Sequence, residues 1–128
     1  MSQGGSFGPG GGGGGGGTFI PFTDVVTSTQ QMVVNHGYTT DDGATLVTLT
    51  LPALAAYGSV MMVVGKASGL WKVAQNAGQI IHFGNHDTTS GVTGYLSSLA
   101  QYDYVWLLCT VANTDFTVIG SAANLTYN

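Results

Sequence analysis

Charge is scarce in this sequence. Of its 128 residues only 6% are Asp, Glu, Lys or Arg, against about a quarter in an ordinary soluble domain. The only basic residues are Lys66 and Lys72, and six Asp bring the formal net charge to −4. Two lysines cannot neutralise a phosphate backbone, so we expect no nucleic-acid partner. The hydrophobic content of 44% excludes an intrinsically disordered chain, which combines low hydrophobicity with high charge.

Cysteine and long apolar runs are also lacking. Cys109 is the single cysteine, which excludes an internal disulfide framework, and its apolar neighbours Trp106, Leu107 and Leu108 predict a core position. No apolar run reaches the roughly 18 residues of a membrane-spanning helix. Residues 1–17 lack the basic and apolar regions of a signal peptide. We therefore expect no membrane span and no N-terminal signal peptide.

Glycine separates the chain into two parts, an arm at 1–17 and a domain at 18–128. Eleven of the first 17 residues are Gly, eight of them consecutive: Gly10, Gly11, Gly12, Gly13, Gly14, Gly15, Gly16 and Gly17. One interpretation is a flexible tether. The other is an extended, polyproline-II-like assembly arm that packs against neighbouring subunits, in which eight residues would reach about 25 Å.

The domain is predicted to be all-β. Residues Thr45–Leu51 alternate apolar and polar side chains after a turn at Asp41-Asp42-Gly43. Val60–Val64 and Tyr104–Val111 are continuously apolar, which favours strands covered on both faces. Further strands are expected at Gln31–Asn35, Leu70–Gln75, Gln79–Phe83, Val92–Leu96, Asp115–Ile119 and Asn124–Tyr127. The only helix-like stretch is Pro52–Tyr57. Eight to ten short strands predict a β-sandwich, specifically a jelly roll.

Such a fold has sheet edges that proteins usually protect with charged residues, and few are available here. The sequence is instead rich in uncharged polar residues, with 16 Thr and 9 Ser. Surfaces of this kind can pack against copies of themselves without desolvating charge. We therefore expect a homo-oligomer, either a trimer or a polymer.

One polar cluster could carry chemistry. His82, His86 and Asp87 are candidate metal ligands, since His-x₃-His spacing occurs in zinc sites. The other interpretation places His82 on a sheet surface and His86 and Asp87 in a loop tip, and on balance we expect no metal and no cofactor. Asp41 and Asp42 are explained by turn formation. No nucleophile motif occurs, so we expect the protein not to be an enzyme.

The aromatic residues divide into core and surface candidates. Trp71, Trp106 and Phe116 lie in strand patterns and are predicted to be core residues. Several tyrosines lie near turns or strand ends, where they could contact other subunits or sugar rings; they are Tyr38, Tyr57, Tyr95, Tyr102 and Tyr127. For a subunit interface the candidates are Tyr104, Trp106, Tyr95 and Tyr102.

Two segments carry a resemblance to a known class of module. The first runs from Gly69 to Gly84 and contains a Trp strand, the turn Gln75-Asn76-Ala77-Gly78-Gln79 and a second strand; the other runs from Tyr104 to Val118. Together they resemble phage tail-fibre-like and bacterial fibre modules over about residues 30–127. Such modules are similar to C1q/tumour-necrosis-factor jelly rolls. The resemblance implies a trimer with strand 104–111 near its centre, although no long shaft accompanies the domain.

These observations favour a non-enzymatic structural subunit that self-assembles into an extracellular or virion fibre or appendage. The alternative is a receptor-binding or glycan-binding tip module of a phage tail fibre or adhesin. In that case the tyrosine-rich turns and the loop His82–Asp87 would contact a cell-surface glycan.

Overall fold

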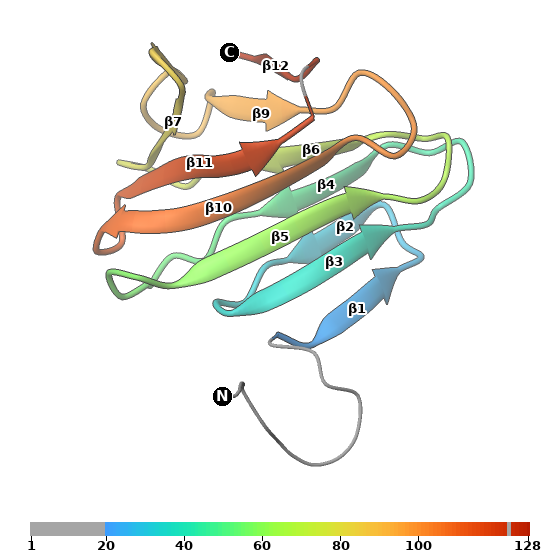
Figure 1. Cartoon of the computed structure of the whole chain (residues 1–128), viewed down its shortest axis with the longest axis horizontal. Coiled ribbons are helices and arrows are strands. Elements are labelled where there is room, and N and C mark those ends of the chain that lie inside the picture. The colour runs from blue at the N-terminus through green and yellow to red at the C-terminus, as the bar shows by residue number, and fades with distance from the viewer. Residues whose placement is uncertain (1–19, 123) are drawn as a thin grey trace, which may run out of the picture.

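The computed structural model describes residues 20–122 and 124–128, and the predicted glycine arm lies outside these residues. The described residues contain strands and no helix, arranged as two stacked sheets (Figure 1). No helix long and apolar enough to cross a bilayer occurs in this part of the chain. The predicted all-β sandwich is confirmed.

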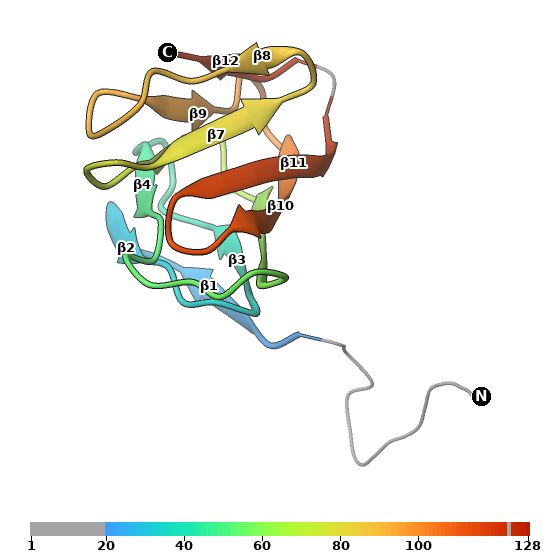
Figure 2. The same cartoon turned by 90° about the vertical axis from the view of Figure 1, so that its left-hand side faces the viewer.

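The larger sheet has seven strands. In spatial order they are β1 (Phe22–Val25), β3 (His36–Thr40), β5 (Val60–Gly65), β10 (Tyr104–Val111), β11 (Asp115–Ser121), β7 (Ile80–Phe83) and β8 (His86–Asp87). The smaller sheet has five: β12 (Thr126–Tyr127), β9 (Tyr95–Ser97), β6 (Trp71–Ala74), β4 (Val47–Thr50) and β2 (Thr29–Gln31). Figure 2 shows the two sheets from the left-hand side of Figure 1, with β8 and β12 close together at the top.

The first seven strands alternate between the sheets, because the chain crosses from one sheet to the other at every connection from β1 to β7. As a result β1, β3 and β5 run parallel, and so do β2, β4 and β6. Antiparallel pairing enters after β7: β8 pairs with β7, β9 pairs with β6, and β10 joins β5 to β11. The finer assignment as a jelly roll stays a prediction.

The core lies between the sheets and follows the period-two pattern of the strands. Trp71 and Phe116 are fully buried, as predicted, and so is Cys109. The indole Nε1 of Trp71 donates to the carbonyl of Asp103 at 2.9 Å, which satisfies the one polar atom of the largest core side chain. Trp106 was wrongly predicted to be a core residue. It is half-buried on the outer face of β10, because alternation along that strand sends Val105 and Leu107 inward instead.

Several boundaries differ from the predicted ones. The strand expected at Gln31–Asn35 ends at Gln31, and the chain turns at Asn35, whose φ is +57°. Strands β1, β3 and β8 were not predicted. The segment Pro52–Tyr57 forms no helix; Ala55 donates to the side chain of Asn113 at 2.8 Å and anchors the segment as a loop.

The strands place the loops at two ends of the sandwich, which differ in charge. The loops 32–35, 51–59, 75–79, 88–94 and 112–114 lie at one end, hereafter the uncharged end, because none contains Asp, Lys or His. The loops 41–46, 66–70 and 98–103 lie at the other, the charged end, on the right of Figure 1. They contain Asp41, Asp42, Lys66 and Asp103. The chain enters β1 at the uncharged end, where the carbonyl of Pro21 accepts from the N–H of Gly37 at 2.8 Å.

Candidate functional site

The outer face of the seven-stranded sheet is apolar at its centre. On β5 and β10 every second side chain faces the core and the alternate ones face outward. The outward set, hereafter the outer apolar face, consists of Phe22, Val60, Met62, Val64, Tyr104, Trp106 and Leu108. The runs Val60–Val64 and Tyr104–Val111 were predicted to be covered on both faces. Within the single chain only their inner face is fully buried, and the other face is partly open.

Register makes this face continuous across four strands. Trp106 lies beside Met62, Met62 beside Gly37, and Gly37 beside Phe22. Gly37 has no side chain, and the Phe22 ring lies over its backbone so closely that a Cβ there would collide with the ring. Phe22 remains 46% exposed. The glycine therefore allows an aromatic ring from the edge strand to extend the apolar surface.

The predicted interface residues do not form one surface. Tyr104 and Trp106 lie together on the outer apolar face. Tyr95 lies on the outer side of the other sheet, where the Lys72 ammonium is 4.7 Å from the centre of its ring. Tyr102 is in the loop before β10, at the charged end, and is 68% exposed.

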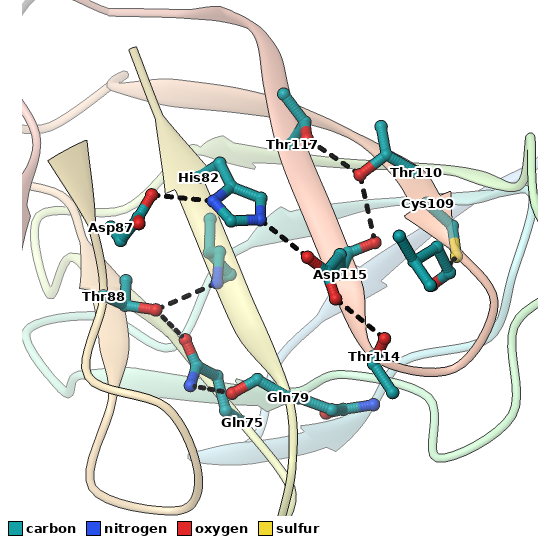
Figure 3. A network of polar contacts seen from close by, with 12 residues as sticks. Gln75, Gln79, His82, Asp87, Thr88, Cys109, Thr110, Thr114, Asp115 and Thr117 are labelled. Atoms are coloured by element: carbon teal, nitrogen blue, oxygen red, sulfur yellow. Dashed lines mark hydrogen bonds and ion pairs between the residues drawn. The ribbon is translucent and has the colours of Figure 1, made fainter. Parts of the chain in front are cut away.

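A histidine held between two carboxylates lies beside the outer apolar face, on strands β8, β7 and β11 (Figure 3). His82 Nδ1 is 2.7 Å from Asp87 Oδ1, and His82 Nε2 is 2.8 Å from Asp115 Oδ2. Both nitrogens carry a proton only in the imidazolium form. Hydrogen bonds to Asp115 and then to Asp87 raise the pKa of His82, and the bond from His82 lowers the pKa of Asp115.

This geometry describes a structural clamp better than a reactive group. Both ring nitrogens of His82 already contact carboxylates, so neither is free to bind a metal or to activate a nucleophile. Of the other two candidate ligands, His86 stacks on Tyr127 with ring centres 5.3 Å apart, and Asp87 hydrogen-bonds to His82 itself. Across residues 20–122 and 124–128, no group of three or more His, Cys, Asp or Glu is arranged to hold a metal ion.

The turn that carries the resemblance is a buried amide network. Gln75 Nε2 donates to the carbonyls of Gln79, Thr89 and Gly91, and its Oε1 accepts from the Thr88 hydroxyl (Figure 3). Four loops that meet at the uncharged end are tied together in this way and by Gln79 itself, whose Nε2 donates to the carbonyls of Pro52 and Asn113 at 2.8 and 3.1 Å. The motif is therefore architectural.

Two features of the structure were not predicted from the sequence. The prediction treated Met62 and Val64 only as members of a buried strand, although a strand apolar on both faces is also typical of a surface covered by another molecule. It also missed the ion-pair cluster of the charged end, where Lys66 Nζ lies 3.2 Å from Asp41 Oδ2 and 3.4 Å from Asp24 Oδ2. No local pattern joins these residues, since the sheet register brings them together.

The chain matches no protein-family model and no curated protein sequence.

Proposed function

We propose that this protein is a non-enzymatic structural subunit that associates with copies of itself through the outer apolar face. The assembly we propose is a trimer that builds an extracellular or virion fibre or appendage. The observation that carries this proposal is the row Phe22, Met62 and Trp106, which crosses the middle of a sheet with no charged residue on β5 or β10.

Self-association suits this face for a physical reason. Contiguous exposed apolar patches are uncommon on monomers and mark contact surfaces. Full burial of a large apolar side chain contributes about 1.5–3 kcal/mol, and the part of each side chain that is still exposed on this face contributes a fraction of that. Charged groups lie only at the borders, with Asp24 on β1 and the His82 clamp on the far strands. A hydrophobic centre with a polar rim is the usual anatomy of a protein interface.

Sedimentation equilibrium of residues 1–128 tests the proposal. We expect a mass of three chains for the wild type. Met62→Lys places an ammonium group in the centre of the face and should yield the monomer. The matched control is Thr50→Lys, which introduces the same charge on an interior strand of the other sheet, again at a half-buried outward position, beside Gln31 and Ala74. It should leave the mass unchanged.

Circular dichroism of both variants verifies that each one folds. A wild-type chain that remains a monomer at all accessible concentrations contradicts the proposal. An equal loss of association in both variants contradicts the assignment to this face.

A further inference from the structure

In the part of the chain that the structure describes, each sheet ends in two edge strands, and these edges differ in how their backbone groups are used. On one side of the sandwich the edges are β8 and β12, which contain two residues each. The end of the chain joins them, since the Asn128 carbonyl accepts from the N–H groups of Thr89 and Tyr95 at 2.8 and 3.3 Å. Short edges that are tied to neighbouring segments offer little backbone to a further strand.

The edge of β2, on the other side of the sandwich, is capped by its own side chains. Parallel pairing with β4 uses the backbone of residues 28, 30 and 32, so the backbone groups of Thr29 and Gln31 face outward. The Thr29 carbonyl accepts from the hydroxyl of Thr27 at 2.9 Å. The Gln31 carbonyl accepts from Nε2 of Gln30 at 2.9 Å. Because both outward carbonyls already have donors, this edge is poorly suited to pair with another strand.

The edge of β1, at the bottom of the larger sheet in Figure 1, has no such caps. The carbonyls of Pro21 and Val25 accept from N–H groups on and just after β3, both at 2.8 Å, so the odd-numbered residues of β1 bond to β3. The backbone N–H and C=O groups of Phe22 and Asp24 therefore face away from the sheet. Among the described residues no hydrogen bond reaches these groups. The β1 edge is thus open to a strand from outside.

The side chains of β1 do not oppose such a strand. Edges that avoid pairing usually carry Lys or an inward-pointing charge, and β1 carries neither. Its one charged residue, Asp24, is paired within the chain with Lys66 and accepts from the hydroxyl of Thr39. Phe22 belongs to the outer apolar face and is 46% exposed, so that face extends to the edge itself. Thr23 lies on the opposite face of the strand and is also exposed.

We propose that the β1 edge pairs with the β1 edge of a second copy of this chain, antiparallel about a two-fold axis at Thr23. In this register Phe22 lies opposite Asp24 of the second copy, and each such pair exchanges both N–H···O bonds. The occupant is a copy because the edge is self-complementary, as a two-fold contact requires. The outer apolar face supports the same choice: it reaches Phe22, and across the axis it continues into the same face of the second copy, where the two Phe22 rings are diagonal neighbours.

This contact is distinct from the one through the outer apolar face, because it uses the rim of the sheet. Each chain of the proposed trimer keeps its β1 edge free to bind an edge of another trimer, so the edge contact extends the assembly. That role rests on the proposed function, whereas the pairing of the edges does not. Since β1 has only four residues, the pairing is weak, and it is populated at protein concentrations higher than those of the sedimentation experiment.

Oxidative crosslinking of Thr23→Cys in the full chain tests the inference, because a disulfide traps a weak contact. The two-fold axis places the two thiols at a non-hydrogen-bonded position, where the Cα atoms are within the reach of a disulfide. The native Cys109 is buried. The matched control is Thr29→Cys, an exposed threonine on the capped β2 edge, which reports chance collisions. With a mild oxidant at high protein concentration, we expect Thr23→Cys to give a covalent dimer well above the yield of this control.

A second pair of variants isolates the backbone hydrogen bonds. Asp24→Ala and Asp24→Pro, each added to Thr23→Cys, both remove the carboxylate, but only proline also removes the outward N–H. Proline should weaken the pairing about tenfold relative to alanine, since the two-fold axis repeats the lost bond. Circular dichroism verifies that each variant folds.

Three results would overturn the inference. They are equal dimer yields from Thr23→Cys and Thr29→Cys, equal yields with alanine and proline at position 24, and protection of the Phe22 and Asp24 amides from hydrogen exchange without a covalent dimer. The last result would indicate that another segment occupies the edge. Met62→Lys, added to Thr23→Cys, separates this inference from the proposed function: the covalent dimer should persist when the outer apolar face no longer associates.

Discussion

The buried side-chain amide of Gln79 joins several loops of the uncharged end. Replacing Gln79 by Ala tests how much its hydrogen bonds stabilise the fold. Its Nε2 donates to the carbonyls of Pro52 and Asn113 at 2.8 and 3.1 Å, and its Oε1 accepts from Asn76 N–H at 2.8 Å. Gln79 and Pro52 are both buried, so the variant leaves the Pro52 carbonyl without its partner and away from water.

The cost follows from how many groups lose their partners. A buried polar group without a partner costs about 1–3 kcal/mol. The Asn76 and Asn113 groups lie closer to solvent and can recover part of their bonding from water. We therefore expect the free energy of unfolding to fall by about 2–3 kcal/mol, which for a domain of this size lowers Tm by about 10 °C.

Urea unfolding at one fixed protein concentration measures this change, because oligomers gain stability with concentration. The control is Gln101→Ala, which removes one exposed hydrogen bond at 3.0 Å and should cost no more than about 0.5 kcal/mol. Gln79→Glu keeps the shape but replaces the donor by an oxygen that faces two carbonyls, and should destabilise at least as much as Gln79→Ala. A Gln79→Ala cost equal to that of the control would refute the role assigned to the network.

Three further outcomes are expected. His82→Gln should lower stability by about 1 kcal/mol. The stabilisation that His82 contributes is complete below pH 6.5 and is lost as pH rises through its raised pKa. The stabilisation that Asp115 contributes is complete above pH 3.8 and is lost as pH falls through its lowered pKa. Urea unfolding across pH should therefore show the largest difference in the free energy of unfolding between wild type and His82→Gln at pH values between these limits. A difference that does not change with pH would contradict the role of His82 as a structural clamp. Gly37→Val should displace the Phe22 ring and weaken trimer formation in sedimentation more than Thr50→Val, which changes a half-buried outward residue of the other sheet. Trp71→Phe removes the indole N–H that donates to the Asp103 carbonyl, which still accepts from the Gly65 N–H, and should cost about 0.5–1.5 kcal/mol in thermal unfolding.

The strands that the sequence predicted best are those with the strongest local pattern. Val60–Val64 and Tyr104–Val111 correspond to β5 and β10 almost residue for residue, since long apolar β-branched runs have few alternatives. By contrast, β3 contains His36 and Gly37, which no propensity argument assigns to a strand. It forms because β5 pairs with it along five residues. Local sequence does not contain that information.

The crossing of the chain from one sheet to the other between β1 and β7 could not be predicted for the same reason. Turn signals indicate where the chain changes direction, but not whether it returns to the same sheet or crosses to the other one. Parallel pairing of β4 with β6, for example, is decided by how Leu49 and Val73 pack into the shared core. The prediction of a sandwich therefore succeeded while its strand order remained out of reach.

The candidate site shows the limit of reading apolar runs. A strand that is apolar on both faces can be covered by a second sheet of its own chain or by another molecule, and the sequence is the same in both cases. The structure separates the two for β10: Leu107 and Cys109 face the second sheet, whereas Trp106 and Leu108 face outward. Their counterparts on the other sheet, such as Thr48 and Thr50, are polar. Only one of the two outer surfaces therefore has the apolar centre through which we propose that copies associate.

The distribution of charge is compatible with the proposed lateral assembly. The strands lie between the uncharged end and the charged end. Contacts between outer apolar faces would therefore place the copies side by side and leave both ends open. Lys66 forms ion pairs with Asp24 and Asp41 within a single chain. These ion pairs reduce the repulsion between the charged ends of neighbouring copies in the proposed assembly. Had the charged groups been on β5 or β10, each contact would require their desolvation. The few charged residues of the described chain therefore lie away from β5 and β10, where they would oppose the proposed assembly.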